Sequence, residues 1–250
     1  MARRKEVLII TYAVPEELEV DELREVIESQ KKNWFCSLPR WRQWLLNRFV
    51  KMYDREVVLI ETGIGKINAF TAVDGTLKTI RKFVSNVKIT VVNLGTAASI
   101  NVGIGNIVEC TRFVDRDLAN LHYFDSPDDY TLYTQNNSLE FSESRLNELD
   151  NWTPKYSCNS GDSFVTDPEQ AYQIRDGWTA VCDMEGYATA LAVIHNSYDF
   201  PEPIKFKSHK YITDVIGEDN NIEGWEEELP AARLELTCLA QEYIRDFYNS

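Results

Sequence analysis

Short apolar runs alternate with segments of helical periodicity along most of the chain. Runs of β-type residues predict strands at 7–14, 57–62, 88–94, 103–113, 179–184 and 204–212. Apolar residues at helical spacing predict helices at 18–30, 66–83, 169–176 and 185–197, and a long one from about Trp225 to the end of the chain. Strands that alternate with helices are typical of an α/β fold whose sheet is covered on both faces.

Two segments stand apart from this alternation. Residues 31–53 mix aromatic with basic side chains, a composition that can stack nucleobases but at helical spacing more often packs on a core or a subunit interface. Residues 118–160 are polar, and we expect irregular loops there. Since no linker, repeat or low-complexity block interrupts the chain, we expect one domain over 1–250.

The charge balance narrows the partners. The chain has 26 basic and 40 acidic residues, a net charge of −14, which disfavours a nucleic acid polymer but not a small nucleoside. Five scattered cysteines indicate a reducing, cytoplasmic compartment, and the three histidines show no metal-binding spacing. No apolar run approaches the ~20 residues of a membrane helix, and the first run is interpreted as a strand rather than a signal peptide.

Three acids follow apolar runs: Glu17, Glu185 and Asp214. Ligands of α/β proteins bind at strand ends, so these acids are candidates for one polar site. Each also has a structural interpretation: Glu17 and Glu185 could stabilise a first helical turn, and Asp214 could cap the segment after its strand. The Gly63–Lys66 turn fits neither a phosphate loop nor a dinucleotide fingerprint, and leaves open a tight turn or a close ligand approach.

Five stretches in this order carry a family resemblance: TGIGKINAF (62–70), VVNLGTAAS (91–99), SGDSFV (160–165), VCDMEGYA (181–188) and KYITD (210–214). Together they resemble the purine nucleoside phosphorylase/uridine phosphorylase family, most closely its 5′-methylthioadenosine/S-adenosylhomocysteine nucleosidase branch. The resemblance covers about residues 7–245. It implies a three-layer α/β/α fold with a central mixed β-sheet, phosphorylase/hydrolase-like, and a homodimer without cofactor or metal.

The resemblance also implies residue roles. Asp214 would face N7 of the purine, Glu17 would be the second catalytic acid, and Glu185 would accept hydrogen bonds from the ribose hydroxyls. The further substrate-binding residues would be Val14, Ile64, Thr96, Asn159, Phe164, Asp183, Met184, Thr213 and Trp225. Departures from the family pattern are Ala97-Ala98 in place of a glycine pair and the polar residues 156–159 before SGD.

This set of residues suits cleavage of an N-ribosidic bond. A carboxylic acid of raised pKa can protonate the departing base, and a second carboxylate can activate water. The loop after the first strand holds acids and no arginine, which favours water over phosphate as nucleophile. Alternatives are phosphorolysis with an arginine such as Arg40, Arg42, Arg48 or Arg112 reaching in, another purine nucleoside such as futalosine or inosine, and a non-catalytic nucleoside-binding or storage protein.

Overall fold

The computed structural model describes residues 5–37, 55–84, 86–119, 138–141, 156–165, 179–217 and 221–250. The strands are β1 (Lys5–Tyr12), β2 (Arg55–Glu61), β3 (Val87–Ser99), β4 (Ile107–Asp115), β5 (Leu139–Glu140), β6 (Tyr156–Ser160), β7 (Thr179–Asp183) and β8 (Lys205–Val215). The helices are a 3-10 turn (Pro15–Glu17), α1 (Val20–Ser37), α3 (Lys66–Phe83), α4 (Arg116–Ala119), α6 (Gly186–Ser197) and α7 (Asn221–Asn249).

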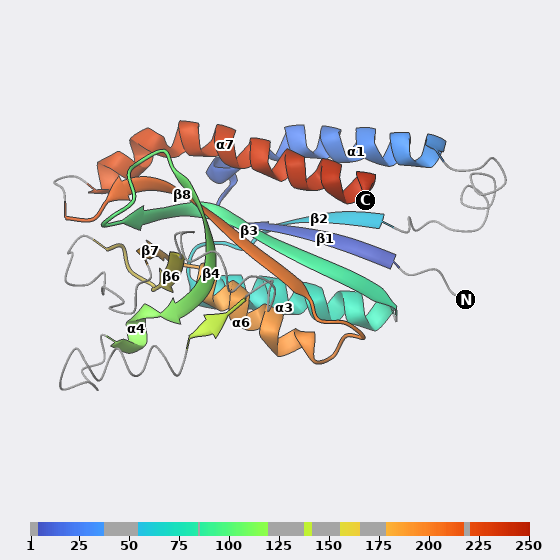
Figure 1. Cartoon of the computed structure of the whole chain (residues 1–250), viewed down its shortest axis with the longest axis horizontal. Helices are drawn as coiled ribbons and strands as arrows, with labels where there is room; N and C mark the ends of the chain where they lie inside the picture. Colours follow the sequence, from blue (N-terminus) through green and yellow to red (C-terminus); the bar gives the residue numbers. More distant parts are fainter. Residues whose placement is uncertain are drawn as a thin grey trace, which may run out of the picture.

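The sheet lies between two layers of helices (Figure 1). Helices α1 and α7 cover one face and bury Leu23, Leu236 and Ile244 against β1 and β3. Helices α3 and α6 cover the other face, where Leu77 and Val193 join the second core cluster. The predicted three-layer α/β/α architecture is therefore confirmed.

The sheet is mixed, as expected. Strands β2, β1, β3 and β8 run parallel to one another, whereas β4 is antiparallel to β8 and β7 is antiparallel to β3. Strand β6 joins β4 to β7 through parallel pairing. The pairings β3–β8–β4–β6–β7–β3 therefore close a ring at one end of the sheet, so the ends of β7 and β8 both lie beside the end of β3.

Helix α3 occupies the predicted residues 66–83, but several strand boundaries were wrong. Strand β3 was expected to end at 94 and continues to Ser99, because its last residues pair with both β7 and β8. Strand β8 was expected to end at 212 and continues to Val215, so Asp214 lies within the strand. Strand β4 begins at Ile107 instead of 103.

The polar region 118–160 was expected to be irregular, yet it contains β5 and β6. Strand β6 is buried although its sequence is polar, because Ser157, Asn159 and Ser160 are fully buried and Ser157 and Ser160 make side-chain hydrogen bonds. The predicted helix at 169–176 lies outside the described residues. Helix α1 extends to Ser37, and the rest of the aromatic and basic segment 31–53 also lies outside them.

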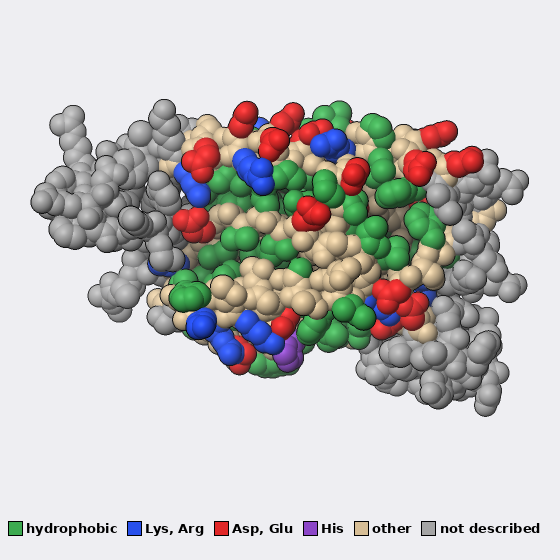
Figure 2. Space-filling model, turned by 180° about the vertical axis from the view of Figure 1, so that it is seen from behind, with side chains coloured by type: hydrophobic (Ala, Val, Ile, Leu, Met, Phe, Trp, Pro, Cys, Tyr) green, Lys and Arg blue, Asp and Glu red, His purple; other side chains and the backbone are tan. Residues whose placement is uncertain are grey.

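Acidic side chains are numerous along the edge of the molecule formed by α1 and α7 (Figure 2). Part of the acidic charge of the chain therefore lies on this helical layer. Cys110, Cys158, Cys182 and Cys238 are free thiols, the first three of them buried. In the described ranges, none of the helices combines the length and the apolar character that a membrane crossing requires.

Candidate active site

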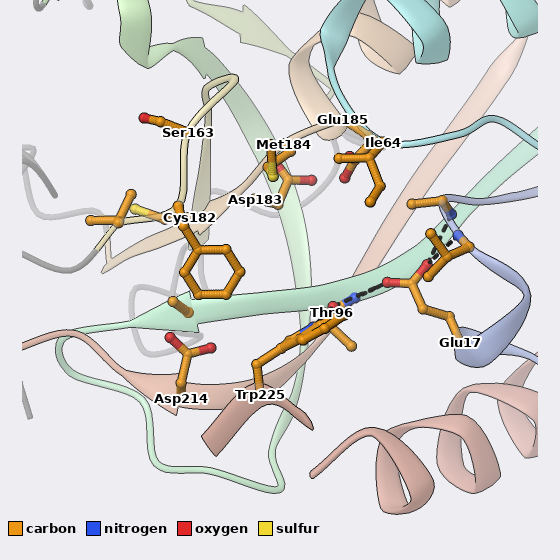
Figure 3. A pocket seen from close by; sticks show the side chains of 15 residues that line it. Glu17, Ile64, Thr96, Ser163, Cys182, Asp183, Met184, Glu185, Asp214 and Trp225 are labelled. Atoms are coloured by element: carbon orange, nitrogen blue, oxygen red, sulfur yellow. Dashed lines mark hydrogen bonds between the residues drawn. The ribbon is translucent and has the colours of Figure 1, made fainter. Parts of the chain in front are cut away.

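A cavity of about 320 Å³ opens where the ends of β1, β3, β7 and β8 meet. Ten of the twelve predicted site residues line it. They are Val14, Glu17, Ile64, Thr96, Phe164, Asp183, Met184, Glu185, Asp214 and Trp225. Ala13, Ala98, Ser163, Val165 and Cys182 complete the lining, so most of the wall is apolar and the carboxylates face it from different sides (Figure 3).

The strand register explains why distant acids converge. Ala98 of β3 pairs with Cys182 of β7 on one side and with Asp214 of β8 on the other. Since Asp183, Met184 and Glu185 follow Cys182 directly, the acidic end of β7 and Asp214 are brought to the same point of the sheet. The end of β3 is therefore the shared support of the site.

A β-bulge sets the direction of Asp214. Ala97 pairs with Ile212 and the next residue, Ala98, pairs with Asp214, so Thr213 is the extra residue of β8. Bulges beside functional sites commonly redirect a side chain. Thr213 is fully buried and donates its hydroxyl to Oδ1 of Asp214 at 2.8 Å. Thr213 thus lies outside the cavity lining and hydrogen-bonds to the acid.

One carboxyl oxygen of Asp214 has no partner among the described residues. Its Oδ2 is buried, and none of the described parts of the chain donates a hydrogen bond to it. Burial raises the pKa of Asp214, while the hydrogen bond from Thr213 acts in the opposite direction. A raised pKa keeps the proton on the carboxyl group closer to neutral pH, the property required of a general acid.

Glu17 lies in a nest of donors at the other side of the cavity (Figure 3). Its Oε2 accepts the backbone N–H of Ala13 at 2.8 Å, and its Oε1 accepts the N–H and the hydroxyl of Thr96 at 2.9 and 3.0 Å. The short 3-10 turn that begins with Pro15 bends the chain so that the carboxylate points back into the site. Glu17 therefore stabilises its turn and also faces the cavity.

Glu185 occupies the N-cap position of α6, yet it does not cap that helix. The N–H groups of Gly186 and Tyr187 are accepted by Asp183 Oδ2 and Ser160 Oγ, at 2.8 and 2.7 Å. Glu185 instead accepts the N–H of Gly65 at 2.8 Å. Its position at the cavity is thus not explained by helix capping. Burial, followed by the charge of Asp183, raises the pKa of Glu185 to about 8.

Lys210 is the main charged residue that the sequence analysis did not select. Its ammonium group lies 2.7 Å from Asp183 Oδ2, and both side chains are 1% exposed. Burial alone would lower the pKa of Lys210, but the neighbouring carboxylates outweigh burial and raise it. Likewise burial alone would raise the pKa of Asp183, but Lys210 holds it below its ordinary value. The sequence feature that could have indicated Lys210 is a lysine at the start of the otherwise uncharged run KYIT, directly before Asp214.

Asn159, predicted to bind substrate, does not line the cavity. Ser160 of the same strand points toward Asp183, to which it donates at 2.5 Å, whereas Asn159 accepts from Ser157. Asn159 is fully buried and is absent from the lining, although its register partner Cys182 belongs to it.

The Gly63–Lys66 turn is a tight strand-to-helix connection. Gly63 and Gly65 have φ angles of 76° and 94°, which side-chain-bearing residues rarely adopt. The N–H of Gly65 is accepted by Glu185 and that of Lys66 by Asp162, the latter at 2.8 Å. Carboxylates of the protein therefore occupy the donors that an anionic ligand would use at the start of α3.

Basic groups are absent from the described lining of the cavity, which holds no lysine or arginine. Arg112, one of the arginines considered for phosphate binding, is buried away from the lining, with Nε 3.9 Å from Glu140. Arg40, Arg42 and Arg48 lie outside the described residues. No group of three potential metal ligands was found within the parts of the chain that are described.

Comparison with known proteins gives a consistent result. No family model matches the chain. A 5′-methylthioadenosine/S-adenosylhomocysteine nucleosidase from Bacillus licheniformis is 30% identical over 176 residues, which cover 67% of this chain and 72% of that protein.

Solved structures show the same fold. One is a 5′-methylthioadenosine/S-adenosylhomocysteine nucleosidase from Neisseria meningitidis in complex with methylthio-immucillin-A. Its structure matches this one with a TM-score of 0.59 at 17% identity, and the match covers 96% of this chain and 99% of the other. Streptococcus pneumoniae MTA/SAH nucleosidase in complex with 8-aminoadenine has a TM-score of 0.57 at 16% identity, with coverages of 95% and 98%. The identity and coverage of the Bacillus relative show the family: the chain belongs to the 5′-methylthioadenosine/S-adenosylhomocysteine nucleosidases.

Proposed function

We propose that this protein hydrolyses the N-ribosidic bond of 5′-methylthioadenosine or S-adenosylhomocysteine and releases adenine. The observation that carries the proposal is the pair of carboxyl groups on one largely apolar cavity. They are Asp214, whose Oδ2 has no hydrogen-bond partner among the described residues, and Glu17 in its nest of donors. The relatives in this family bear the names of nucleosidases for these substrates.

The acid step belongs to Asp214. Cleavage leaves negative charge on the departing purine, and protonation at N7 makes the base a neutral leaving group. The raised pKa of Asp214 allows it to hold that proton, and its Oδ2 is available to face the base. The apolar residues around it, including Phe164 and Val165, exclude water from the base end of the cavity.

The nucleophile is water, activated by Glu17. An inverting glycosidase uses one carboxyl group as acid and a second as base, with room for water between them. Glu17 and Asp214 lie on different sides of the cavity, as this scheme requires (Figure 3). Glu185, beside Met184, accepts hydrogen bonds from the ribose hydroxyls, and in its ionised form it stabilises the positive charge that develops on the sugar.

Phosphate is disfavoured as nucleophile for a structural reason. The N–H groups of Ala13 and Thr96, which could bind a phosphate oxygen, already bind the carboxylate of Glu17. Two like charges at this site would repel each other in a partly desolvated cavity. The described lining also offers no arginine or lysine to compensate.

The substrate and the nucleophile can be tested together. The purified protein is incubated in phosphate-free buffer with methylthioadenosine, S-adenosylhomocysteine, inosine or futalosine, and the base and sugar products are separated by chromatography. We expect adenine and a free reducing sugar from the first two nucleosides, at a rate that added phosphate does not raise. Formation of a sugar 1-phosphate would contradict hydrolysis, preferential cleavage of another nucleoside would contradict the substrate, and binding without turnover would indicate a non-catalytic protein.

The organisation of the molecule in the cell is also proposed. We propose a single domain over residues 1–250, a cytoplasmic location, supported by the four described cysteines that are free thiols, and a homodimer. The exposed apolar side chains of Ile64 and Phe164 line the cavity, and Ile67 is exposed at the start of α3. These side chains support a neighbouring subunit at this face. Sedimentation of the full chain at several concentrations tests the dimer.

A further inference from the structure

Trp225 does more than fill space in the cavity wall, because its indole N–H also makes a hydrogen bond. This residue belongs to the first turns of α7 and lines the cavity. Its indole N–H donates to the hydroxyl of Thr96, with Nε1 3.1 Å from Oγ1. The same hydroxyl is 3.0 Å from Oε1 of Glu17. A continuous chain of hydrogen bonds thus joins α7 to the proposed base.

The donors and acceptors of this chain fix its direction. The indole N–H can only donate, and an ionised carboxylate can only accept. A threonine hydroxyl has one proton and two lone pairs. Because Trp225 occupies one lone pair of Thr96 Oγ1, the threonine proton is directed to Glu17, and the second lone pair is left for one further donor.

This direction matters for the water that attacks the sugar. With its proton committed to Glu17, the Thr96 hydroxyl cannot donate to that water, and neither can an ionised Glu17. The water can then only donate to these two residues, and its own lone pair stays available for the sugar carbon. Orientation of this kind is a recognised contribution to rate.

We propose that Trp225 is a positioning residue that acts through Thr96: its indole N–H orients the Thr96 hydroxyl toward Glu17 and thereby the attacking water. This role rests on the hydrolytic function proposed above. The neighbouring contacts hold the ring in place, since Phe164 packs edge-on against it with ring centroids 6.3 Å apart and an interplanar angle of 77°. Trp225 therefore contacts the base side of the cavity with its ring and the nucleophile side with its N–H.

The test separates the N–H from the ring. Two proteins are compared with the wild type for base release from methylthioadenosine: Trp225→Phe, and a protein with a tryptophan analogue at position 225 in which sulfur replaces the indole N–H. The analogue keeps the shape of the ring and loses the donor. We expect kcat to fall about fivefold in both, the size of one neutral hydrogen bond. In the sulfur-analogue protein we expect KM to change by less than about twofold, because the ring keeps its contacts with the substrate.

Thr96 provides the second arm. In Thr96→Val the hydroxyl is absent and the shape is kept, so adding Trp225→Phe should cause no further loss of kcat. Thr96→Ser restores a hydroxyl and should restore the sensitivity to Trp225→Phe. Independently of turnover, the indole N–H resonance of Trp225 in ¹⁵N-tryptophan-labelled protein should move in Thr96→Val.

The outcomes separate the two proposals. An active wild type whose sulfur-analogue protein keeps full kcat would overturn the positioning role and leave hydrolysis standing. The same holds if the Trp225→Phe loss persists in full in Thr96→Val, or if the indole resonance does not move. A wild type that releases no base from any nucleoside would overturn the proposed function and, with it, the role of Trp225.

Discussion

Glu185 is buried beside another acid and also faces the cavity. Its carboxyl group is buried beside the charge of Asp183, yet it faces the part of the cavity where sugar hydroxyls are proposed to bind. A pKa raised to about 8 favours the protonated, neutral carboxyl over the carboxylate near neutral pH. Its protonation state should therefore be visible in the stability of the protein.

The stability prediction concerns Glu185→Gln, which keeps a neutral side chain of the same shape. The folded-state pKa of about 8 lies above the ordinary 4.5, so the stabilising contribution of the neutral carboxyl is full below pH 4.5 and is lost as pH rises through 8. We expect the free energy of unfolding of the wild type, relative to Glu185→Gln, to fall between pH 5 and pH 9 by on the order of a few kcal/mol. Urea unfolding of both proteins measures it, and a constant difference would contradict the burial of an uncharged Glu185.

Glu17 is predicted to exclude anions by filling its own nest of donors. In Glu17→Ala the N–H groups of Ala13 and Thr96 lose their acceptor and become available to an added anion. We expect inorganic phosphate to raise the Tm of Glu17→Ala by at least about 2 °C. Base release should fall by at least about 100-fold.

Glu16→Ala is the matched control, because Glu16 is the exposed neighbour on the same 3-10 turn. Thermal denaturation with and without phosphate should show no shift for this variant or for the wild type. Equal phosphate effects in all three proteins would show that the nest around Glu17 is not the anion site.

At the scale of the elements, the junction of β7 with α6 leaves little room. A Cβ at Gly186 would lie 2.6 Å from Cys158 Sγ and 2.9 Å from Asp183 Oδ2. Gly186→Ala would therefore displace the carboxylate that caps α6 and pairs with Lys210. We expect a loss of about 1–3 kcal/mol in the free energy of unfolding, with lower activity.

Unlike Gly186, Gly75 has room for a side chain. It lies within α3, and a Cβ there meets no atom within 4 Å. Gly75→Ala should raise the free energy of unfolding by up to about 1 kcal/mol through helix propensity. Chemical denaturation compares the two variants, and a neutral Gly186→Ala would show that the junction adapts more readily than its distances indicate.

The sequence predicted the elements better than their ends. Helix α3 was predicted correctly because its apolar spacing is regular and a glycine turn precedes it. The continuation of β3 through Gly95–Ser99 was not predicted, because it depends on pairing with two strands that lie more than 80 residues away. The bulge at Thr213 has the same origin, since only the register with β3 reveals an extra residue.

For the site, too, residues with a local sequence signal were predicted, and residues whose role depends on long-range pairing were not. The three acids could be selected because they follow apolar runs, where ligands of α/β proteins bind, and because five motifs carry a family resemblance. Lys210 was missed since its partner Asp183 is 27 positions away and only the fold brings the two together. Asn159 was expected at the cavity and does not line it, because strand pairing decides which buried residues of a strand reach the cavity, and a polar sequence does not reveal that pairing.

At the scale of the whole molecule, the ring of strands at one end of the sheet creates the site. Pairing of β3 with both β7 and β8 brings Asp214 and the Asp183–Glu185 segment to one cavity, and the loop after β1 adds Glu17. Helix α7 then closes the same cavity with Trp225. The proposed chemistry therefore depends on one junction of the fold.

The most direct test of the central claim is the rate of adenine release from methylthioadenosine in phosphate-free buffer at pH 7, by the wild type and by Asp214→Asn. Asparagine keeps the shape of the side chain and cannot give a proton to the base. We predict that the wild type turns over without phosphate and that kcat of Asp214→Asn is lower by about 100- to 10,000-fold. A variant as fast as the wild type, or a wild type that needs phosphate, would contradict the account.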